Sequence, residues 1–424
     1  MPLEKVIFFK LKVINMKKSN RLFFAMAGFL VLAMTTNVFA QDWPQWMGTN
    51  RDGKVTGFLA PKTWPAQLTT QWKVTVGLGD ASPVLAGGKL YSFARLDSNE
   101  VITCMDVTTG QKVWVNNFPA LAITGPASSQ HPGPRSTPVV GEGKIVTLGV
   151  GGVLSCLNAA TGALEWRNEG FIDDLPAFFT SLSPMIYKGN CIVHLGGKEK
   201  GQIIAFDLKT GKQKWLSASD GPSYASLAMM TVNGKKQIVD LTSKNLVGID
   251  PENGKLLWSF PVPCENRFYN SATPVIDGQT VIITGQGQGT KAIKIQKQGD
   301  TFVATELWKN AELGTKWNTP VLKDGFLYGL SDGRKLFCMN AATGKTAWID
   351  AKLHNDFGTI VDAGSVIIAL PQTSNLVVFK PDEKAYTEVA TIKVADTPTY
   401  TYPLIAGNKL FVKDKESLSL LILQ

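Results

Sequence analysis

The chain has 424 residues, 44% of them hydrophobic, and a formal net charge of +9. This composition is ordinary for a globular protein that buries a core. The first 40 residues hold six Lys or Arg and one Glu, so residues 41–424 carry only +4 and contain no basic cluster. That distribution argues against a nucleic-acid-binding protein.

The first 40 residues have the pattern of a secretory signal peptide. A basic stretch from Lys17 to Arg21 precedes an apolar run from Leu22 to Met34, and Asn37 to Ala40 ends in small residues suited to cleavage. We expect translation to start at Met16 and the mature chain to begin at Gln41. A membrane anchor is the alternative, but 13 apolar residues are too few to span a bilayer. The predicted location is therefore the periplasm or the outside of the cell, with no transmembrane span and no lipid-anchor cysteine at the cleavage point.

After this leader, a short unit recurs along the chain in steps of 39 to 55 residues. A glycine in a polar turn between two apolar runs marks each unit: Gly88, Gly143, Gly189, Gly234, Gly278, Gly325, Gly364 and Gly407. Six units open with Ser-Pro, Thr-Pro or Tyr-Pro, at Pro83, Pro138, Pro184, Pro274, Pro320 and Pro403. Proline is tolerated at the first position of a strand. Two more apolar runs follow the turn, so each unit predicts four short strands.

The third strand of five units ends in one phrase, Asp/Asn-x-x-x-Gly-x-x-x-Trp. The copies are DVTTGQKVW (106–114), NAATGALEW (158–166), DLKTGKQKW (207–215), DPENGKLLW (250–258) and NAATGKTAW (340–348). The Asp or Asn can accept hydrogen bonds from the following backbone and start a turn. The large tryptophan can bury its face between neighbouring units. The predicted docking tryptophans are Trp72, Trp114, Trp166, Trp215, Trp258, Trp308 and Trp348.

Repeated four-stranded units predict an all-β fold, a β-propeller of eight blades with four antiparallel strands each. The last unit has only three strands, and the strand around Trp72 is expected to complete it and close the ring. Seven blades and an open solenoid are the alternatives. The predicted organisation is a signal peptide at 1–40, an N-terminal extension at 41–67 and the propeller at 68–424.

The five cysteines are expected to be mostly free, buried thiols rather than a disulfide framework. Cys104, Cys156 and Cys338 occupy one equivalent position of the unit, where Ala205 and Gly248 stand in sister units. Cysteine acts as a small hydrophobe at such a position. Equivalent positions of different units should lie too far apart to bond.

The phrase resembles the tryptophan-docking motif of the pyrroloquinoline-quinone (PQQ) binding-like propeller family, and 205–215 match that motif in full. The stretches 42–46 and 50–53 also resemble the opening of exported members of that family. The resemblance covers residues 42–424 and implies the propeller fold. One branch, the quinoprotein dehydrogenases, would imply PQQ and Ca²⁺ acting on alcohols or sugars. The other, the outer-membrane assembly propeller lipoprotein, would imply partner binding.

Propeller ligands sit near the start of the innermost strands, so residues ahead of the Ser/Thr-Pro pairs are the candidate site. These are His131, Arg135, Tyr224, Arg267, Asn270, Lys316, Trp317 and Asn318. His131 could act as a base or ligand, and Trp317 could stack under a planar ring, with Lys316 and Asn318 bonding its edge. The alternative for each is packing around the channel. No catalytic residues and no metal-spaced motif are identified.

The leading hypothesis is a non-catalytic binding or scaffold protein that presents its loops to an envelope protein or glycan. It requires no cofactor, and we expect a monomer. The alternative is a PQQ- and Ca²⁺-dependent oxidoreductase. A third possibility is a carbohydrate-active enzyme that uses carboxylates at the channel mouth.

Overall fold

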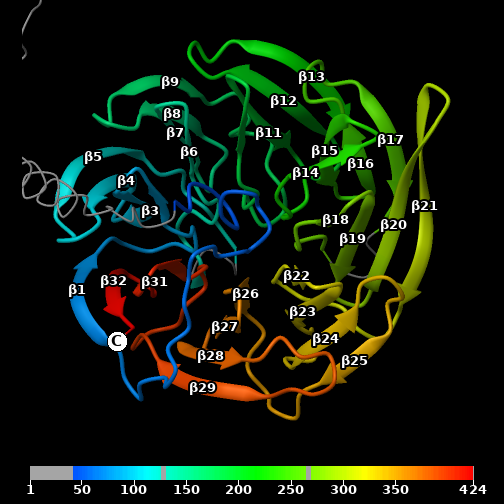
Figure 1. Ribbon diagram of the computed structural model, residues 1–424. Helices are drawn as coiled ribbons and strands as arrows, with labels where there is room; N and C mark the ends of the chain where they lie inside the picture. The colour runs from blue at the N-terminus through cyan, green and yellow to red at the C-terminus, as the bar shows by residue number, and fades with distance from the viewer. Residues whose placement is uncertain (1–41, 126–129, 264–268, 424) are drawn as a thin grey trace, which may run out of the picture. The chain divides into compact units, whose positions relative to one another are not determined.

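The computed structural model describes residues 42–125, 130–263 and 269–423. The described residues form 32 strands in eight four-stranded antiparallel sheets. The sheets follow one another around a ring (Figure 1), which confirms the eight-bladed β-propeller. The predicted signal peptide, Arg267 and Cys264 lie outside the described residues.

Each blade runs from a short inner strand to an outer edge strand. The first four blades are β2 (Val84–Ala86), β3 (Lys89–Leu96), β4 (Asn99–Asp106) and β5 (Lys112–Pro119); β6 (Val139–Gly141), β7 (Lys144–Leu148), β8 (Leu154–Asn158) and β9 (Leu164–Asn168); β10 (Met185–Tyr187), β11 (Asn190–Gly196), β12 (Gly201–Asp207) and β13 (Gln213–Ser219); β14 (Ala228–Val232), β15 (Lys235–Leu241), β16 (Asn245–Ile249) and β17 (Leu256–Pro261).

The remaining blades repeat this order, and the last one borrows its outer strand. They are β18 (Val275–Asp277), β19 (Thr280–Gly285), β20 (Gly289–Gln298) and β21 (Thr301–Asn310); β22 (Val321–Lys323), β23 (Phe326–Leu330), β24 (Leu336–Asn340) and β25 (Thr346–Ile349); β26 (Gly358–Asp362), β27 (Ile367–Pro371), β28 (Asn375–Phe379) and β29 (Glu388–Lys393); β30 (Leu404–Ala406), β31 (Lys409–Lys413), β32 (Ser417–Ile422) and β1 (Thr69–Thr75).

The ring closes between the two ends of the propeller, as the sequence predicted. Strand β1 pairs antiparallel with β32, with Trp72 opposite Leu420 and Thr75 opposite Ser417. Figure 1 shows this blue strand beside the red C-terminal strands. The pairing gives β32 a neighbour, so the last blade has no unfinished edge inside the ring.

A belt of hydrogen bonds joins neighbouring blades at the start of the inner strands. In six joints a backbone N–H of one blade donates to a Ser or Thr hydroxyl of the next. The pairs are Tyr402 to Ser82, Ser82 to Thr137, Thr137 to Ser183, Ser183 to Ser226, Ser226 to Thr273 and Thr273 to Thr319, at 2.9–3.2 Å. We call these residues the hydroxyl belt. Five of its hydroxyl residues directly precede a proline of the Ser/Thr-Pro pairs.

The outer strands are joined by the tryptophans of the phrase. The indole N–H of Trp114 donates to the Ala159 carbonyl of the next blade at 3.0 Å, and Trp166 does the same to Leu208 at 2.9 Å. Trp215, Trp308 and Trp348 repeat this bond at 2.7–3.2 Å. The fifth blade lacks the phrase on which the tryptophan of the fourth blade would dock, and that tryptophan, Trp258, instead donates to Gln237 of its own blade at 2.6 Å.

The rest of the phrase shapes the surface on which the previous tryptophan lies. Asp106 Oδ1 accepts the N–H groups of Thr108 and Thr109 at 3.0 Å, and the Thr109 bond helps to hold the pKa of that carboxyl below its usual range. The glycine that follows has a positive φ. A Cβ at Gly110 would lie 2.8 Å from the Trp72 ring, so the glycine serves both the turn and the dock.

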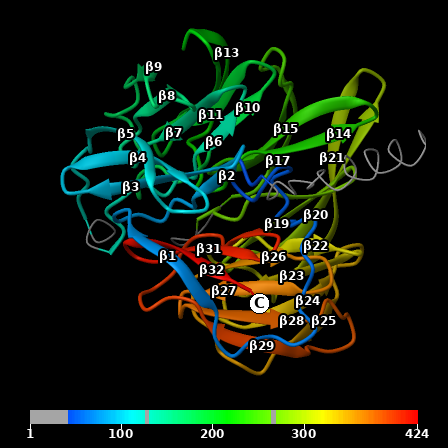
Figure 2. The ribbon, with the colours of Figure 1, turned by 60° about the vertical axis from the view of Figure 1, so that its left-hand side comes forward.

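The segment ahead of β1 fills the middle of the ring (Figures 1 and 2). Arg51 is 7% exposed, and its guanidinium donates to the carbonyls of Leu227, Pro184 and Ser183 at 2.8–3.1 Å. Burial lowers the pKa of Arg51 to about 9. Trp46 donates to the Thr273 hydroxyl at 2.9 Å. This segment therefore fastens to blades three, four and five at the level of the hydroxyl belt.

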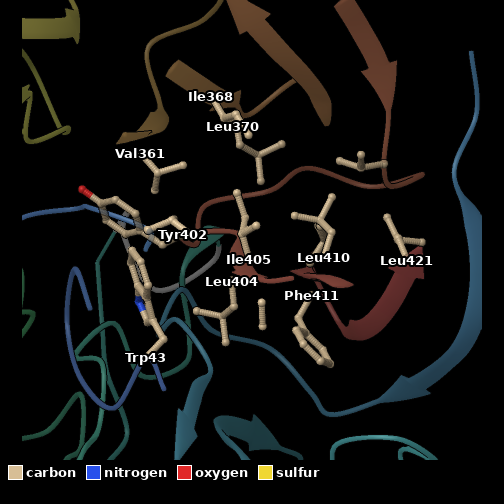
Figure 3. Close-up of a cluster of buried hydrophobic side chains, with 14 of the residues drawn as sticks. Trp43, Val361, Ile368, Leu370, Tyr402, Leu404, Ile405, Leu410, Phe411 and Leu421 are labelled. Carbon is tan, nitrogen blue, oxygen red and sulfur yellow. The ribbon is translucent and has the colours of Figure 1, made fainter. Parts of the chain in front are cut away.

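The same segment also contributes to the largest apolar core. Trp43 pairs with Leu85 of the first blade and is 2% exposed. Figure 3 shows Trp43 and Tyr402 at one side of a cluster built mainly from the last two blades, including β31 and β32 of the last one. The N-terminal segment thus contributes side chains to the propeller core.

The cysteine expectation is confirmed for the four described thiols. Cys104, Cys156, Cys191 and Cys338 are free and buried. Burial raises the pKa of the Cys104 thiol to about 11 and those of Cys156 and Cys338 to about 12. These thiols are unreactive core residues.

Alanine substitutions at two glycines can distinguish the loss of stability caused by a clash with a docked tryptophan from the loss caused by backbone strain. Gly162 and Gly143 have φ of 73° and 75°, but a Cβ would overlap the Trp114 ring only at Gly162, and nothing lies within 4 Å at Gly143. We expect Gly143→Ala to lower the free energy of unfolding by about 1 kcal/mol through strain alone. Gly162→Ala should cost a further ~1–3 kcal/mol through overpacking. Urea unfolding measures both, and equal losses would contradict the docking role.

A buried carboxyl predicts an unusual dependence of stability on pH. Glu100 is 1% exposed and accepts the Val150 N–H at 2.8 Å, beside Gly149 of the next blade. Burial raises the pKa of Glu100 to about 7, from about 4.3 in an unfolded chain. In this range the unfolded chain binds fewer protons than the folded one. The stability contributed by Glu100 is therefore complete below about pH 4.3 and is lost as the pH rises through 7.

Glu100→Gln should remove this loss, because the amide stays neutral and its oxygen can still accept the Val150 N–H. We expect the variant to gain about 1–3 kcal/mol over wild type on going from pH 5 to pH 8. Urea midpoints at both pH values measure the gain. Glu312→Gln, at an exposed position, is the matched control and should show none. An unchanged difference between Glu100→Gln and wild type across that range would refute the assignment.

Candidate functional site

The connections between blades carry aromatic side chains to one mouth of the channel. Each runs from the outer strand of one blade to the inner strand of the next, and seven consecutive connections each supply one planar ring. The rings are His131, Phe178, Tyr224, Tyr269, Trp317, Phe357 and Tyr400. We call this set the aromatic collar. Because it lies where the inner strands begin, the hydroxyl belt fixes the loops that carry it.

The collar consists of two arcs of rings in mutual contact. In the first, Tyr269 lies edge-on to Phe178, with centroids 5.0 Å apart, and to Tyr224, at 5.7 Å. In the second, Trp317 stacks on Phe357 at 5.7 Å with 7° between the planes, and Phe357 meets Tyr400 edge-on at 5.3 Å. His131 ends this arc, edge-on to Tyr400 at 4.9 Å.

Arg135 joins the two arcs. Its guanidinium donates to the carbonyl of Phe178 in the first arc and to that of His131 in the second, the latter at 3.0 Å. Burial lowers the pKa of Arg135 from its ordinary value, though a guanidinium remains charged near neutral pH. Arg135 is thus engaged by backbone carbonyls around the mouth, the structural role that was one of its two predicted readings.

His131 has a partner that lies far away in sequence. Its Nδ1 is 2.7 Å from Oδ2 of Asp80, and the two side chains are 16% and 21% exposed. A hydrogen bond from Nδ1–H to the carboxylate fixes the ring orientation and leaves Nε2 as the second polar atom of the imidazole. A carboxylate that orients an imidazole is one element of acid–base sites, but within the described residues no nucleophile hydrogen-bonds this histidine.

The lysine and tryptophan predicted together do lie together. Lys316 Nζ is 3.0 Å from Asp356 Oδ2, and Arg334 approaches the other oxygen at 3.8 Å. Trp317 is 36% exposed while it stacks on Phe357. The ring is therefore available at the mouth, whereas the nearby charges are paired with each other.

The two asparagines of the predicted site are buried in the wall instead. Asn270 and Asn318 are each 3% exposed. The Asn318 amide donates to the Leu330 carbonyl at 2.5 Å and accepts its N–H at 3.2 Å, and Asn270 donates to Thr242 at 2.9 Å. Both side chains hold connections against neighbouring strands.

Two pockets open beside the collar. The tyrosine pocket, about 350 Å³, lies against the first arc and is lined by Tyr224, Tyr269 and prolines, with Lys198, Glu199 and Lys244 at its edge. The Asp80 pocket, about 430 Å³, lies against the second arc and includes Tyr400 and Gln372. Both volumes fall in the ~300–1,000 Å³ range of small-molecule sites.

Sequence reasoning missed four of the seven collar rings. Phe178, Tyr269, Phe357 and Tyr400 were not singled out, nor was Asp80. A signal existed for the rings, since each lies in the few residues ahead of an inner strand, as Tyr224 and Trp317 do. No local signal links Asp80 to His131, which is 51 residues away.

The described residues offer little that would hold a metal or cross a membrane. No group of three or more His, Cys, Asp or Glu is placed there to bind a metal ion. Within the same residues, no helix has the length and apolarity that a membrane span requires.

Comparison with known proteins agrees with this architecture. The ring of docked four-stranded blades defines a propeller of the PQQ-like repeat class. A family model for the outer membrane protein assembly factor BamB matches residues 98–350, which is more than half of the chain. The chain therefore belongs to that family.

Individual relatives include BamB proteins and quinoprotein dehydrogenases. BamB of Burkholderia pseudomallei is 26% identical over 367 residues, covering 80% of this chain and 84% of the relative. Quinohemoprotein alcohol dehydrogenase of Comamonas testosteroni is 29% identical over 139 residues, covering 32% of this chain but only 19% of the dehydrogenase. The crystal structure of BamB from Moraxella catarrhalis superposes with a TM-score of 0.62 at 14% identity, over 85% of this chain and 98% of that one. A likeness at this identity shows the fold alone.

Proposed function

We propose that this protein is a non-catalytic binding scaffold of the cell envelope, and that the aromatic collar is the face that binds a protein partner. Residues 1–40 would act as the signal peptide that exports it to the periplasm or beyond, residues 41–67 would form the extension, and 68–424 the propeller. The protein would bind as a monomer and without a cofactor.

The observation that carries the proposal is the collar itself. Seven rings from seven connections gather at one mouth, and the tyrosine pocket gives two of them, Tyr224 and Tyr269, a concave setting. Tyrosine and tryptophan dominate the binding energy of protein interfaces, because they bury a large apolar area with little loss of conformational entropy. The rim of paired and unpaired charges around the tyrosine pocket suits a polar border to such an interface.

The chemistry of the mouth supports binding over quinone-dependent oxidation. PQQ carries three carboxylates, which would need cations, but Lys316 is paired with Asp356 and Arg135 is engaged by two carbonyls. Ca²⁺ would need a shell of several oxygen ligands, whereas the mouth carboxylates Asp80 and Asp356 each face a cationic or imidazole partner. The residues at the mouth therefore suit the quinone and its metal poorly, which supports the binding function.

The extent of the similarities points the same way. The alignment with BamB spans most of both proteins, whereas that with the alcohol dehydrogenase covers less than a fifth of the dehydrogenase. BamB and the dehydrogenases share the repeat, which is a structural dock between blades and does not distinguish their functions. The oxidoreductase therefore remains the alternative function.

Photo-crosslinking from single positions tests the proposed face. A photoreactive phenylalanine analogue at Tyr269 or Trp317 should capture one discrete envelope protein, because both positions lie in the collar. The matched position is Tyr187, the last residue of inner strand β10 and so at the end of that strand away from the collar. Immunoblotting and mass spectrometry of the adducts give the result.

The expected pattern is one adduct at the collar positions and none at Tyr187. Tyr224→Ala should weaken the adduct at Tyr269 at least tenfold, as expected for a central aromatic contact. Thermal unfolding checks that this variant, which loses the bond from the Phe178 N–H to Tyr224 Oη, is folded. Equal capture from Tyr187, or no discrete adduct from either collar position, would overturn the proposal.

A further inference from the structure

The Asp80 pocket lies between the last two blades and the first. Asp80 comes from the connection into the first blade, Gln372 from the turn after β27, and Tyr400 from the connection into the last blade. Pro132 and Pro398 line it as apolar walls, and Lys415 stands in its lining as well. Four separate segments thus bring a carboxylate, an amide, a phenol and an ammonium group to one space.

The polar side chains of this pocket are held in place by residues around it. Asp80 Oδ2 is bound by His131 at 2.7 Å, and the Asp80 backbone N–H donates to the Pro134 carbonyl at 2.8 Å. The Gln372 amide donates to Tyr400 Oη at 2.5 Å, while the Gln372 N–H donates to the Phe357 carbonyl at 2.9 Å. Polar groups fixed in this way are ready to bind without reorganising.

These bonds decide which atoms face a ligand as donors and which as acceptors. Because Tyr400 Oη accepts from Gln372, its own O–H proton is left to donate elsewhere. Asp80 Oδ1 and Gln372 Oε1 are acceptors, and the Lys415 ammonium is a donor. Within the described residues none of these three atoms has a hydrogen-bond partner in the chain.

The ring of Tyr400 is rigid for a separate reason. It meets His131 edge-on at 4.9 Å and 82°, and Phe357 edge-on at 5.3 Å and 86°. With the two prolines, it gives the pocket flat apolar surface next to its donors and acceptors. A ligand that suits the site has an apolar face and a polar edge.

The charges around the pocket disfavour an ionic ligand. An anion would face Asp80, and a cation would face Lys415 and the buried Lys413, whose Nζ donates to the Gly79 carbonyl at 2.6 Å. Burial lowers the pKa of Lys413 to about 8, so its ammonium is still largely charged near neutral pH. The nearly balanced set of charges favours a neutral polar molecule.

We propose that the Asp80 pocket is a binding site for a neutral hexose, either free or as a unit of a glycan. Each sugar hydroxyl both donates and accepts, which matches the Asp80 and Gln372 acceptors and the Tyr400 donor at fixed positions and the exposed Lys415 ammonium beside them, and the C–H face of the ring can lie on Tyr400 or the prolines. The inference rests on the proposed function in taking the collar as the binding face. It uses the pocket beside Tyr400 of the second arc, whereas the crosslinking positions that test the protein partner are Tyr269 and Trp317.

Ligand-observed NMR with methyl glycosides tests the site on the full mature chain. The probes are the methyl glycosides of glucose, galactose, mannose and N-acetylglucosamine, followed by a linear oligosaccharide of whichever sugar binds. At least one glycoside should bind saturably with a millimolar dissociation constant. Tighter binding of the oligosaccharide indicates a polymeric glycan, and equal binding per site indicates a free sugar; both support the hexose site.

Substitutions connect the binding to the pocket. Asp80→Asn and Gln372→Ala should each weaken the glycoside at least tenfold, because a site built to pair a hydroxyl rejects a mismatch strongly. Asp277→Asn, at an exposed turn, is the matched control and should bind as wild type does. Thermal unfolding checks that each variant is folded, and Lys415→Ala, at an exposed side chain, gives a second folded test.

Two results would overturn the hexose site: no glycoside binds, or binding is unchanged in Asp80→Asn, Gln372→Ala and Lys415→Ala. Neither result affects the crosslinks from Tyr269. Conversely, loss of those crosslinks with intact glycoside binding would remove the protein-partner proposal alone. The two proposals therefore fail separately.

Discussion

The hydroxyl belt is the interaction on which the rest of this structure depends. In six joints a backbone N–H donates to a Ser or Thr hydroxyl of the next blade, from Tyr402 through Ser82 and on to Thr319. A single bond of this kind contributes only about 1 kcal/mol, but each one sets where an inner strand begins. Since the residues just ahead of that point carry the collar rings, the belt also sets the geometry of the binding face. The N-terminal segment fastens to the same level through Arg51 and Trp46.

The sequence allowed the features that recur from blade to blade to be predicted, but not the contacts that occur only once in the ring. The glycine turns, the Pro starts and five copies of the docking phrase led to eight blades and to the closing strand at Trp72, and all were confirmed. The belt was not predicted, because a Ser or Thr ahead of a proline carries no local signal for a hydrogen bond to the neighbouring blade. The collar was found only in part, because its rings lie in connections of unequal length. Contacts such as Asp80 with His131 depend on ring closure, which brings distant segments together.

The candidate site consists of a rigid ring of blades and of mouth loops whose side chains, in the described residues, do not form a catalytic set. Outer tryptophans and inner hydroxyls fix both edges of every joint that has them, so the mouth loops are presented by a stiff ring. The charges at the mouth are largely paired with each other, so the aromatic rings are the groups left to bind a partner. Trp317, for example, is 36% exposed. A frame of this kind suits recognition of a partner and a glycan side by side. The carbohydrate-active enzyme considered from sequence would need two cooperating carboxylates, whereas Asp80 and Asp356 are each paired separately.

Tryptophan-fluorescence titration with PQQ, with and without Ca²⁺, tests most directly whether the mouth is a binding face rather than a cofactor site. The protein should be the mature chain from Gln41, compared with Trp317→Ala. The account predicts no saturable quenching at micromolar quinone in either protein, with or without the metal. Saturable micromolar quenching that Trp317→Ala abolishes would contradict it, and would establish the collar as the seat of a quinone-dependent oxidoreductase.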